Sequence, residues 1–202
     1  MAEHPLAGLS SATVHEAYGM RGALPSAVKP VDPDFYLCGP VFTIDCPPAD
    51  NLWLHRAIYA AAPGDVLVAD MRGHTEAGYW GEVLSQAAIA RGIAGLVMTG
   101  GVRDTREIST LRFPVFAANV CIRGTVKDPR GDGRLGGSMR IGDVDVHPGD
   151  TVVGDADGAV VVGAHHVDSV AQAGRARVAS EREMLKRLRR GESTIDILGL
   201  PT

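Results

Sequence analysis

The sequence predicts a single domain of the mixed α/β class, and three observations support this. Glycine and proline residues divide the chain into short β-rich runs and a few helical stretches. The 202 residues are 45% hydrophobic and 22% charged, which suffices for one well-buried core but not for a second independent one. A charged stretch with helical periodicity covers residues 167–190 and predicts a long C-terminal helix.

The first predicted elements follow one another between residues 35 and 70. FYLCGPVFTIDC, residues 35–46, predicts one strand, or two strands that are broken at the Gly-Pro pair. DNLWLHRAIYAA, residues 50–61, predicts a helix with Asp50 or Asn51 as its cap. PGDVLVADM begins at Pro63 with a proline-glycine turn before β-branched residues, so it predicts the start of a strand.

The next elements lead to a pair of opposite charges. A helix is predicted over residues 81–91, and Gly92 ends it and opens the apolar run GIAGLVM, which predicts a buried strand. Two glycines follow, and then Arg103 and Asp104. A second proline-glycine turn at Pro148 starts PGDTVVGDADGAVVVG, which is again β-rich.

The glycine-rich and charged segment GTVKDPRGDGRLGGSMR, residues 124–140, predicts a long loop. It contains GDGRLG, which has the spacing of a dinucleotide-binding motif. That function requires a strand before the motif and a helix that opens on its last glycine, whereas a β-rich run follows here. We therefore interpret the segment as a mobile or ligand-covering loop.

Composition narrows the classes of partner. The formal net charge of −4 and the absence of a basic block in the first hundred residues argue against nucleic acid, so small molecules or proteins are expected. No stretch has the pattern of a signal peptide or the length of a membrane helix, which predicts a cytoplasmic protein without membrane contact. Cys38, Cys46 and Cys121 form no CxxC pair, and we expect reduced, buried thiols.

The charged pair can be placed beside a helix start. Ligands of α/β sheets collect outside the carboxyl ends of strands, and a helix N-terminus offers unpaired amides to an anion. One predicted pocket therefore combines the amides near Glu82, Val83 and Leu84 with the side chains of Glu82, Arg103 and Asp104. Such a set could hold a carboxylate ligand and a hard cation, Mg²⁺ or Mn²⁺. The alternative is a surface turn in which both charges pair with neighbours.

Five segments carry a resemblance that covers nearly the whole chain: ATVHEAYGMRGALPS (12–26), CGPVFTIDCPPADNLWLHRAI (38–58), PGDVLVADMRGHTEAGYWGEVLSQAAIARGIAGLVMTGGVRD (63–104), FPVFAANVCIRGTVKD (113–128) and PGDTVVGDADGAVVV (148–162). They resemble the 4-hydroxy-4-methyl-2-oxoglutarate / 4-carboxy-4-hydroxy-2-oxoadipate aldolases. These are class II pyruvate aldolases related to the ribonuclease-activity regulators called RraA. The most specific element is an acidic residue, twenty intervening residues and Arg-Asp, here Glu82 with Arg103 and Asp104. The resemblance implies a single domain over residues 1–202 with a β/β/α swivelling-type core.

The same resemblance implies roles for the predicted pocket. Asp104 would hold the divalent metal, and Arg103 would contact the oxygens of the substrate. The backbone from Gly81 to Leu84 would bind the pyruvyl carboxylate, and Glu82 would help to hold water on the metal. The expected cofactor is Mg²⁺ or Mn²⁺, and the expected ligand is a 2-keto acid.

Three further side chains are implied with alternatives left open. Asn51 matches a polar residue on the substrate side, or it is a plain helix cap. Glu16 matches an acidic residue that reaches the site of a neighbouring subunit, or it is a solvated glutamate in a first helical turn. From the C-terminal helix, Glu181 best matches a glutamate that crosses the subunit boundary to the metal site, with Glu183 as the alternative. This sharing predicts a homotrimer or homohexamer.

One position departs from the family pattern, because Thr99 stands where the family usually has aspartate. This leaves aldolase-type chemistry as the prediction and puts the substrate range in question. The lysines of the chain lie in a turn, a polar loop and a charged helix, at Lys29, Lys127 and Lys186. None is placed for desolvation, so a metal rather than a Schiff base is expected to stabilise the enolate.

The predicted function is the cleavage of 4-hydroxy-2-keto acids, with 4-carboxy-4-hydroxy-2-oxoadipate and 4-hydroxy-4-methyl-2-oxoglutarate as the expected substrates. The products would be pyruvate plus oxaloacetate or a second pyruvate. The same enolate forms when oxaloacetate loses CO₂, so a decarboxylase side activity is expected. Arg103 would stabilise the charge, and Glu16 would move the proton from the C4 hydroxyl. The alternatives are a dedicated oxaloacetate decarboxylase and a non-catalytic regulator like RraA, which would have no need of Glu82.

Overall fold

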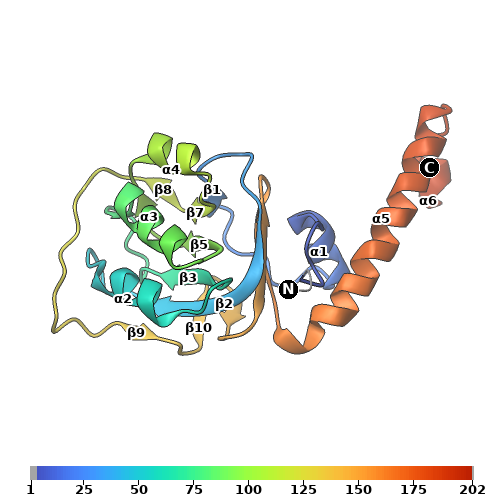
Figure 1. Cartoon of the computed structure of the whole chain (residues 1–202). Coiled ribbons are helices and arrows are strands. Elements are labelled where there is room, and N and C mark those ends of the chain that lie inside the picture. Colours follow the sequence, from blue (N-terminus) through green and yellow to red (C-terminus); the bar gives the residue numbers. More distant parts are fainter. Residues whose placement is uncertain (1–3, 202) are drawn as a thin grey trace.

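The computed structural model describes residues 4–201. One mixed sheet lies at the centre of the fold (Figure 1). Its strands run in the order β1, β7, β5, β3, β2, β12, β13, and β9 pairs with β2. These strands are β1 (Lys29–Pro30), β2 (Leu37–Asp45), β3 (Val66–Asp70), β5 (Gly95–Met98), β7 (Val115–Ala117), β9 (Arg134–Leu135), β12 (Thr151–Asp155) and β13 (Gly158–Val162).

Two smaller sheets and the helices complete the fold. One sheet has three strands in parallel, β4 (Gly78–Trp80), β6 (Gly101–Val102) and β8 (Asn119–Val120), and the other is the hairpin of β10 (Met139–Ile141) and β11 (Val144–Val146). The helices are α1 (Ser11–Ala17), α2 (Leu52–Ala60), α3 (Glu82–Ala90), α4 (Thr105–Leu111), the 3-10 turn η1 (Ala164–His166), α5 (Val167–Arg189) and α6 (Thr194–Leu198). The predicted α/β class is confirmed.

The parallel strands β2, β3, β5 and β7 form the centre of the fold. The runs VLVA of β3 and GLVM of β5 are buried along their whole length, as expected of parallel strands that are covered on both faces. Gly92 closes α3 in a left-handed conformation (φ +71°), and the chain then enters β5. The carboxyl ends of these strands therefore meet at one edge of the sheet.

β2 is a single strand that runs through the Gly39-Pro40 pair. Its first residues pair with β12, and its pairing with β3 begins only at Val41. Pro40 therefore precedes the part of β2 that pairs with β3. The N–H that proline lacks is not needed for a hydrogen bond to β3. Strand β2 thus joins the parallel strands to the β12–β13 hairpin.

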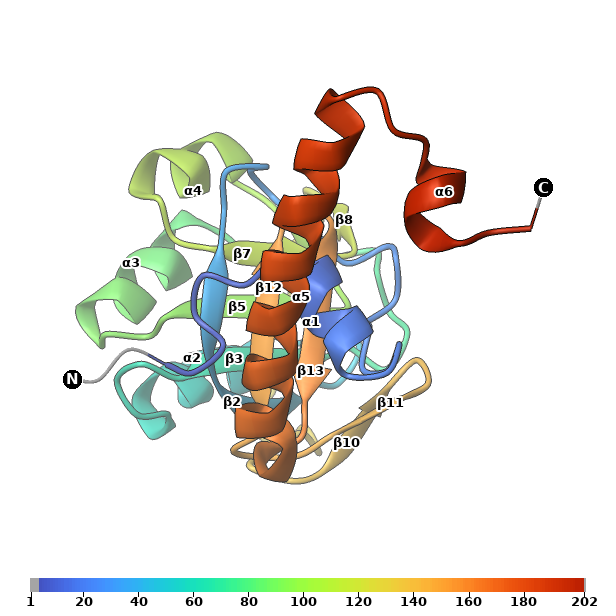
Figure 2. The ribbon, with the colours of Figure 1, turned by 90° about the vertical axis from the view of Figure 1, so that its right-hand side faces the viewer.

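Strands β12 and β13 separate two apolar clusters. Val152 and Val161 belong to the main core, whereas Val153 and Val160 pack with Leu6 and the base of α5. This follows from the two-residue period of a strand. Figure 2 shows α1 and α5 on that outer side, away from α2, α3 and α4.

Helix α5 confirms the predicted long C-terminal helix. Its buried residues lie at its beginning, Val170, Ala171 and Gly174, and from there the helix projects away from the core (Figure 1). None of the helices within residues 4–201 has the length and apolarity that crossing a membrane requires. Of the three free cysteines, Cys46 is buried as predicted, whereas Cys38 and Cys121 are half-buried.

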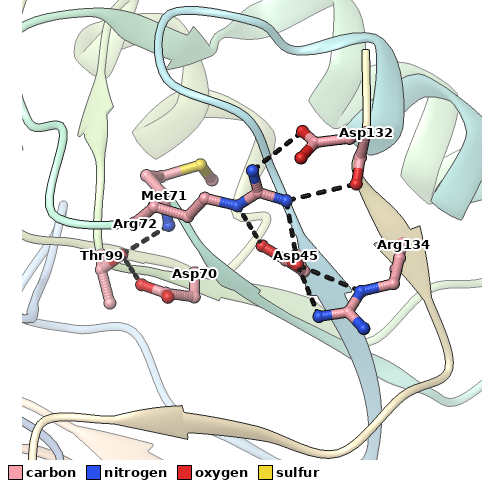
Figure 3. Close-up of polar contacts among 7 residues, drawn as sticks. All are labelled: Asp45, Asp70, Met71, Arg72, Thr99, Asp132 and Arg134. Atoms are coloured by element: carbon pink, nitrogen blue, oxygen red, sulfur yellow. Dashed lines mark hydrogen bonds and ion pairs between the residues drawn. The ribbon is translucent and has the colours of Figure 1, made fainter. Parts of the chain in front are cut away.

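The segment predicted as a loop at residues 124–140 holds the short strand β9 and is fixed by ion pairs (Figure 3). The Arg72 guanidinium donates to both oxygens of Asp45, at 2.7 and 3.1 Å, and to Asp132 of the loop at 2.8 Å. Arg134 of β9 pairs with the same Asp45 at 3.3 Å. Hydrogen bonds from Arg72 hold the pKa of Asp45 below its usual range. The GDGRLG motif opens no helix, as expected of this spacing outside a βαβ unit.

Candidate active site

The Arg-Asp pair lies where the three-stranded sheet meets two helix starts. Strand β4 runs directly into α3 at Gly81, and β6 runs into α4 through Arg103 and Asp104. The parallel pairing of β4 with β6 brings the two helix starts together, because both strands end at the same edge. Arg103 N–H donates to the carbonyl of Trp80 at 2.9 Å and fixes the junction.

Asp104 has an unusual backbone conformation. It occupies the N-cap position of α4 with φ +55° and ψ +40°, a left-handed conformation that aspartate tolerates better than most residues. Its side chain does not cap α4. Its Oδ2 instead accepts the N–H of Glu82 at 3.1 Å, which ties the two helix starts together.

Three glycines make the floor of this site. A Cβ on Gly81 would lie 2.3 Å from Asp104 Oδ2, and a Cβ on Gly78 would lie 3.3 Å from both Cβ and Cδ of Arg103. A Cβ on Gly101 would lie 2.6 Å from the carbonyl of Ala77. The stem of Arg103 therefore runs over bare backbone from Gly81 to Gly78.

Arg103 and Asp104 both keep access to solvent. Their side chains are 47% and 41% exposed, and Arg103 Nε lies 3.9 Å from Asp104 Oδ2. A partly exposed pair at this distance is worth about 0–1 kcal/mol, so it holds neither group away from a ligand. The surface turn that was the alternative interpretation is therefore present, and in it the two side chains pair only weakly with each other. Both charged groups can still contact a ligand.

The start of α3 supplies fewer free amides than the sequence predicts. Asp104 takes the N–H of Glu82, and the first intrahelical bond is Ser85 N–H to Gly81 O at 3.1 Å. The amides of Val83 and Leu84 precede that bond and have no carbonyl acceptor inside α3. The expectation of a free Glu82 amide is therefore wrong, because a carboxylate of the same chain already occupies it.

Asn51 is bonded to β4 and does not act as a side-chain cap. It stands at the N-cap position of α2, but its Nδ2 donates to Tyr79 O of β4 at 2.9 Å, and Asp50 Oδ1 accepts the N–H of Leu52 instead. Its Oδ1 is buried and has no hydrogen-bond partner within the described residues. Tyr79, on the same strand, accepts the N–H of Ala49 at its hydroxyl at 2.7 Å.

Thr99 directly follows β5 and takes a structural role (Figure 3). Its hydroxyl donates to Asp70 Oδ1 at 2.8 Å and accepts the N–H of Met71 at 2.8 Å. Gly100 next to it faces the core, where a Cβ would lie 2.6 Å from Met71 Cγ. Thr99 thus joins the carboxyl ends of β3 and β5 and adds no group to the Arg103 site.

Glu16 and Glu181 lie together but away from Arg103 in the same chain. Arg177 of α5 pairs with Glu16 of α1, and its Nε lies 2.8 Å from Glu181 Oε1. Figures 1 and 2 place α1 and α5 on the opposite side of the molecule from α3 and α4. Glu183 pairs with Lys186 instead, at 3.0 Å.

The expected position of Glu16 in a first helical turn is wrong, because it occupies the last turn of α1. It pairs with Arg177 rather than standing free in solvent. Glu181 rather than Glu183 shares this pair, so the structure groups the two glutamates that the family resemblance singles out.

The donors around Asp104 suit a hard divalent cation. No three His, Cys, Asp or Glu side chains converge as a metal cluster within residues 4–201, so one chain offers few direct protein ligands. Every contact recorded for the Asp104 carboxylate in that range involves Oδ2, which leaves Oδ1 available on a partly exposed group. A site of one or two carboxylates completed by water is the usual Mg²⁺ arrangement. The residues present therefore fit Mg²⁺ or Mn²⁺.

A cavity of about 880 Å³ lies elsewhere, between α1, the β10–β11 hairpin and the 3-10 turn η1. Its lining includes His15, Tyr18, Arg21, His147 and His166. It contains no residue of α3, α4 or β6, so size alone does not lead to the Arg-Asp pair. Sequence reasoning did not identify Gly78 and Gly101 as site residues, and the only signal was the frequency of glycine near the motif.

Comparison with known proteins identifies the family of the chain. The sequence model of the RraA-like family, which is described as Aldolase/RraA, matches residues 11–161. The chain belongs to this family. A protein of Halalkalibacterium halodurans named "Putative 4-hydroxy-4-methyl-2-oxoglutarate aldolase" is 34% identical over 158 residues, which are 78% of this chain and 74% of that protein.

Solved structures share the fold of this RraA-like chain. An uncharacterized protein from Pseudomonas syringae pv. tomato superposes with a TM-score of 0.82 over 96% of this chain and 94% of its own, at 23% identity. The RNA-processing inhibitor RraA from Thermus thermophilis superposes with a TM-score of 0.67 over 75% of this chain and 91% of its own, at 26% identity. The family thus holds proteins named as aldolases and proteins named as regulators.

Proposed function

We propose that the protein is a divalent-metal-dependent class II aldolase. It cleaves 4-hydroxy-2-keto acids, with 4-carboxy-4-hydroxy-2-oxoadipate and 4-hydroxy-4-methyl-2-oxoglutarate as the preferred substrates, and releases pyruvate with oxaloacetate or a second pyruvate. The observation that carries the proposal is the meeting of Arg103, Asp104 and the start of α3 over a floor of glycines. Loss of CO₂ from oxaloacetate is a side activity of the same site.

Different residues of the site bind different groups of the substrate. The amides of Val83 and Leu84 bind the carboxylate of the 2-keto acid at the positive end of α3. Arg103 donates to the keto oxygen, where negative charge grows as the carbon–carbon bond breaks. Asp104 and Glu82 hold the cation, which supplies Lewis-acid stabilisation of the enolate when it is bound.

A proton must leave the C4 hydroxyl as the bond breaks. We propose that Glu16 takes it, and that Glu16 and Glu181 reach the site of a neighbouring subunit in a homotrimer or homohexamer. The grouping of both glutamates on Arg177, far from the Arg103 of their own chain, supports this arrangement. An acid–base group of this kind contributes about 10²–10⁴-fold to the rate.

Pyruvate release tests the proposal, measured with purified protein, both substrates and added Mg²⁺ or Mn²⁺. Asp104→Asn and Arg103→Ala should each lower turnover by at least about a hundredfold, whereas Arg103→Lys recovers part of the loss. Arg91→Ala and Asp143→Asn change the same residue types at exposed positions away from both helix starts and should leave turnover unchanged. Full activity of a folded Asp104→Asn protein, or pyruvate release by the wild type without any divalent metal, would contradict the proposal. A wild type that releases no pyruvate with either metal would favour a regulator.

A further inference from the structure

The segment after β8 crosses over the glycine floor. A Cβ on Gly78 would lie 2.3 Å from the carbonyl oxygen of Cys121, and a Cβ on Gly101 would lie 3.0 Å from Cys121 Cβ. Gly78 N–H donates to the carbonyl of Arg123 at 2.8 Å, which binds the segment to the start of β4. Residues 121–123 therefore form one wall of the site.

Arg103 and this wall meet at the same glycine. The stem of Arg103 lies 3.3 Å from the position of a Cβ on Gly78, and Cys121 O lies 2.3 Å from it. The floor thus has two ends. The α3 start and Asp104 are at the Gly81 end, and Arg123 is at the Gly78 end.

The guanidinium of Arg123 is held only weakly. Its Nη1 lies 3.4 Å from Glu76 Oε2, and the two side chains are 70% and 61% exposed. A surface pair of this kind is worth about 0–1 kcal/mol, so an anion of comparable strength can replace Glu76. Burial, and then the charge of Lys127, the next cation along the segment, lower the pKa of His55 in α2.

We propose that Arg123 binds the distal carboxylate of the substrate and selects 2-keto acids that carry a second anionic group. This rests on the proposed function, in which the first carboxylate occupies the Gly81 end of the floor. The keto acid then extends along Arg103 toward Gly78. Arg123 exchanges its pair with Glu76 for a charge-assisted bond to the far end of the substrate.

Paired substrates and a matched control test the proposal. 4-Hydroxy-4-methyl-2-oxoglutarate carries the distal carboxylate, and 4-hydroxy-2-oxopentanoate lacks it. Arg123→Ala should lower kcat/KM for the first by about 10- to 150-fold, mainly through KM, and leave the second unchanged. Arg123→Lys should restore part of the loss. Arg130→Ala removes an arginine that is 91% exposed on the following loop and should change neither substrate.

The neighbouring glutamate gives an independent check. Glu76→Gln should raise kcat/KM for the dicarboxylate about two- to threefold in the presence of Arg123, and should have no effect in the Arg123→Ala background. Equal losses on both substrates in Arg123→Ala, or no loss on either, would overturn the assignment. Proton exchange at the methyl group of pyruvate, which has no distal group, should stay at the wild-type rate in Arg123→Ala.

Binding separates this inference from the proposed function. Titration calorimetry with Mn²⁺ present compares 2-oxoglutarate with 2-oxopentanoate, which has the same chain length and no distal carboxylate. The wild type should bind 2-oxoglutarate at least tenfold more tightly, and Arg123→Ala should remove that preference. If no hydroxy-keto acid is cleaved, the proposed function fails, while this preference still decides the role of Arg123. Equal affinity of the wild type for both acids would refute it.

Discussion

Replacing Gly81 by alanine would place a methyl group against the carboxylate of Asp104. The built Cβ lies 2.3 Å from Oδ2 and 3.1 Å from Cγ of Asp104, and 3.3 Å from Cγ of Arg103. Asp104 has to move by about 1 Å to reach ordinary contact, and a displacement of that size in a catalytic group costs about a hundredfold in rate. We therefore expect kcat to fall by at least about a hundredfold, and Mn²⁺ affinity to fall with it.

The fold should survive this change. Gly81 has φ −163° and ψ −163°, an extended conformation that alanine adopts without strain. Loss of the Glu82 N–H bond to Asp104 costs about 1.5–3 kcal/mol, partly offset by about 0.4–1 kcal/mol from the stiffer unfolded chain. The melting temperature should therefore fall by less than about 10 °C.

Two measurements decide the outcome. Pyruvate release at saturating metal gives kcat, and electron paramagnetic resonance of free Mn²⁺ gives the metal affinity. Gly137→Ala is the matched control, because a Cβ at Gly137 meets nothing within 4 Å. Wild-type turnover and metal affinity in a folded Gly81→Ala protein would refute the placement of the metal at Asp104.

Three other predictions concern stability and assembly. Thr99→Val should lower the free energy of unfolding in urea by about 1–3 kcal/mol, because Asp70 and the Met71 amide lose their bonds, and Thr99→Ser should recover most of it. Arg72→Met should destabilise the protein at pH 7 by about 1–3 kcal/mol. Since Arg72 lowers the pKa of Asp45, that difference is full above about pH 4 and should shrink as the pH falls through the folded-state pKa; a constant difference would exclude Asp45 as the cause. Light scattering should give three or six times the chain mass of 21.2 kDa, and a monomer would contradict the shared site.

The sequence predicts the elements that carry strong periodic signals. Strands β3 and β5 read as apolar runs because both faces are covered, and α5 shows helical spacing over its whole length. The proximity of Arg103 to Gly81 also followed from the sequence, since a helix start and a strand end were expected at one edge. The expected motif residues therefore came together in space, while their roles stay predictions.

The features of the fold and the site that the sequence did not predict depend on contacts between residues distant in sequence. Strands β4, β6 and β8 have two or three residues each, too few for a two-residue period to appear, so the sheet that builds the site was not predicted. Thr99 finds its partner Asp70 across 29 positions, which no local pattern encodes. The capture of the Glu82 amide by Asp104 depends on the left-handed turn at Asp104, and nothing in the spacing of the motif reveals it.

The left-handed backbone at Asp104 limits which acidic residue can occupy this position, in nature or by design. Aspartate and asparagine enter that conformation at low cost, whereas a longer acid such as glutamate pays about 1–2 kcal/mol and moves its carboxylate one bond further out. Position 82 has ordinary helical backbone and accepts either acid. The two carboxylates of the motif are therefore unequal. Under the proposed metal dependence, variation in metal preference should accumulate at residue 82, while residue 104 stays aspartate.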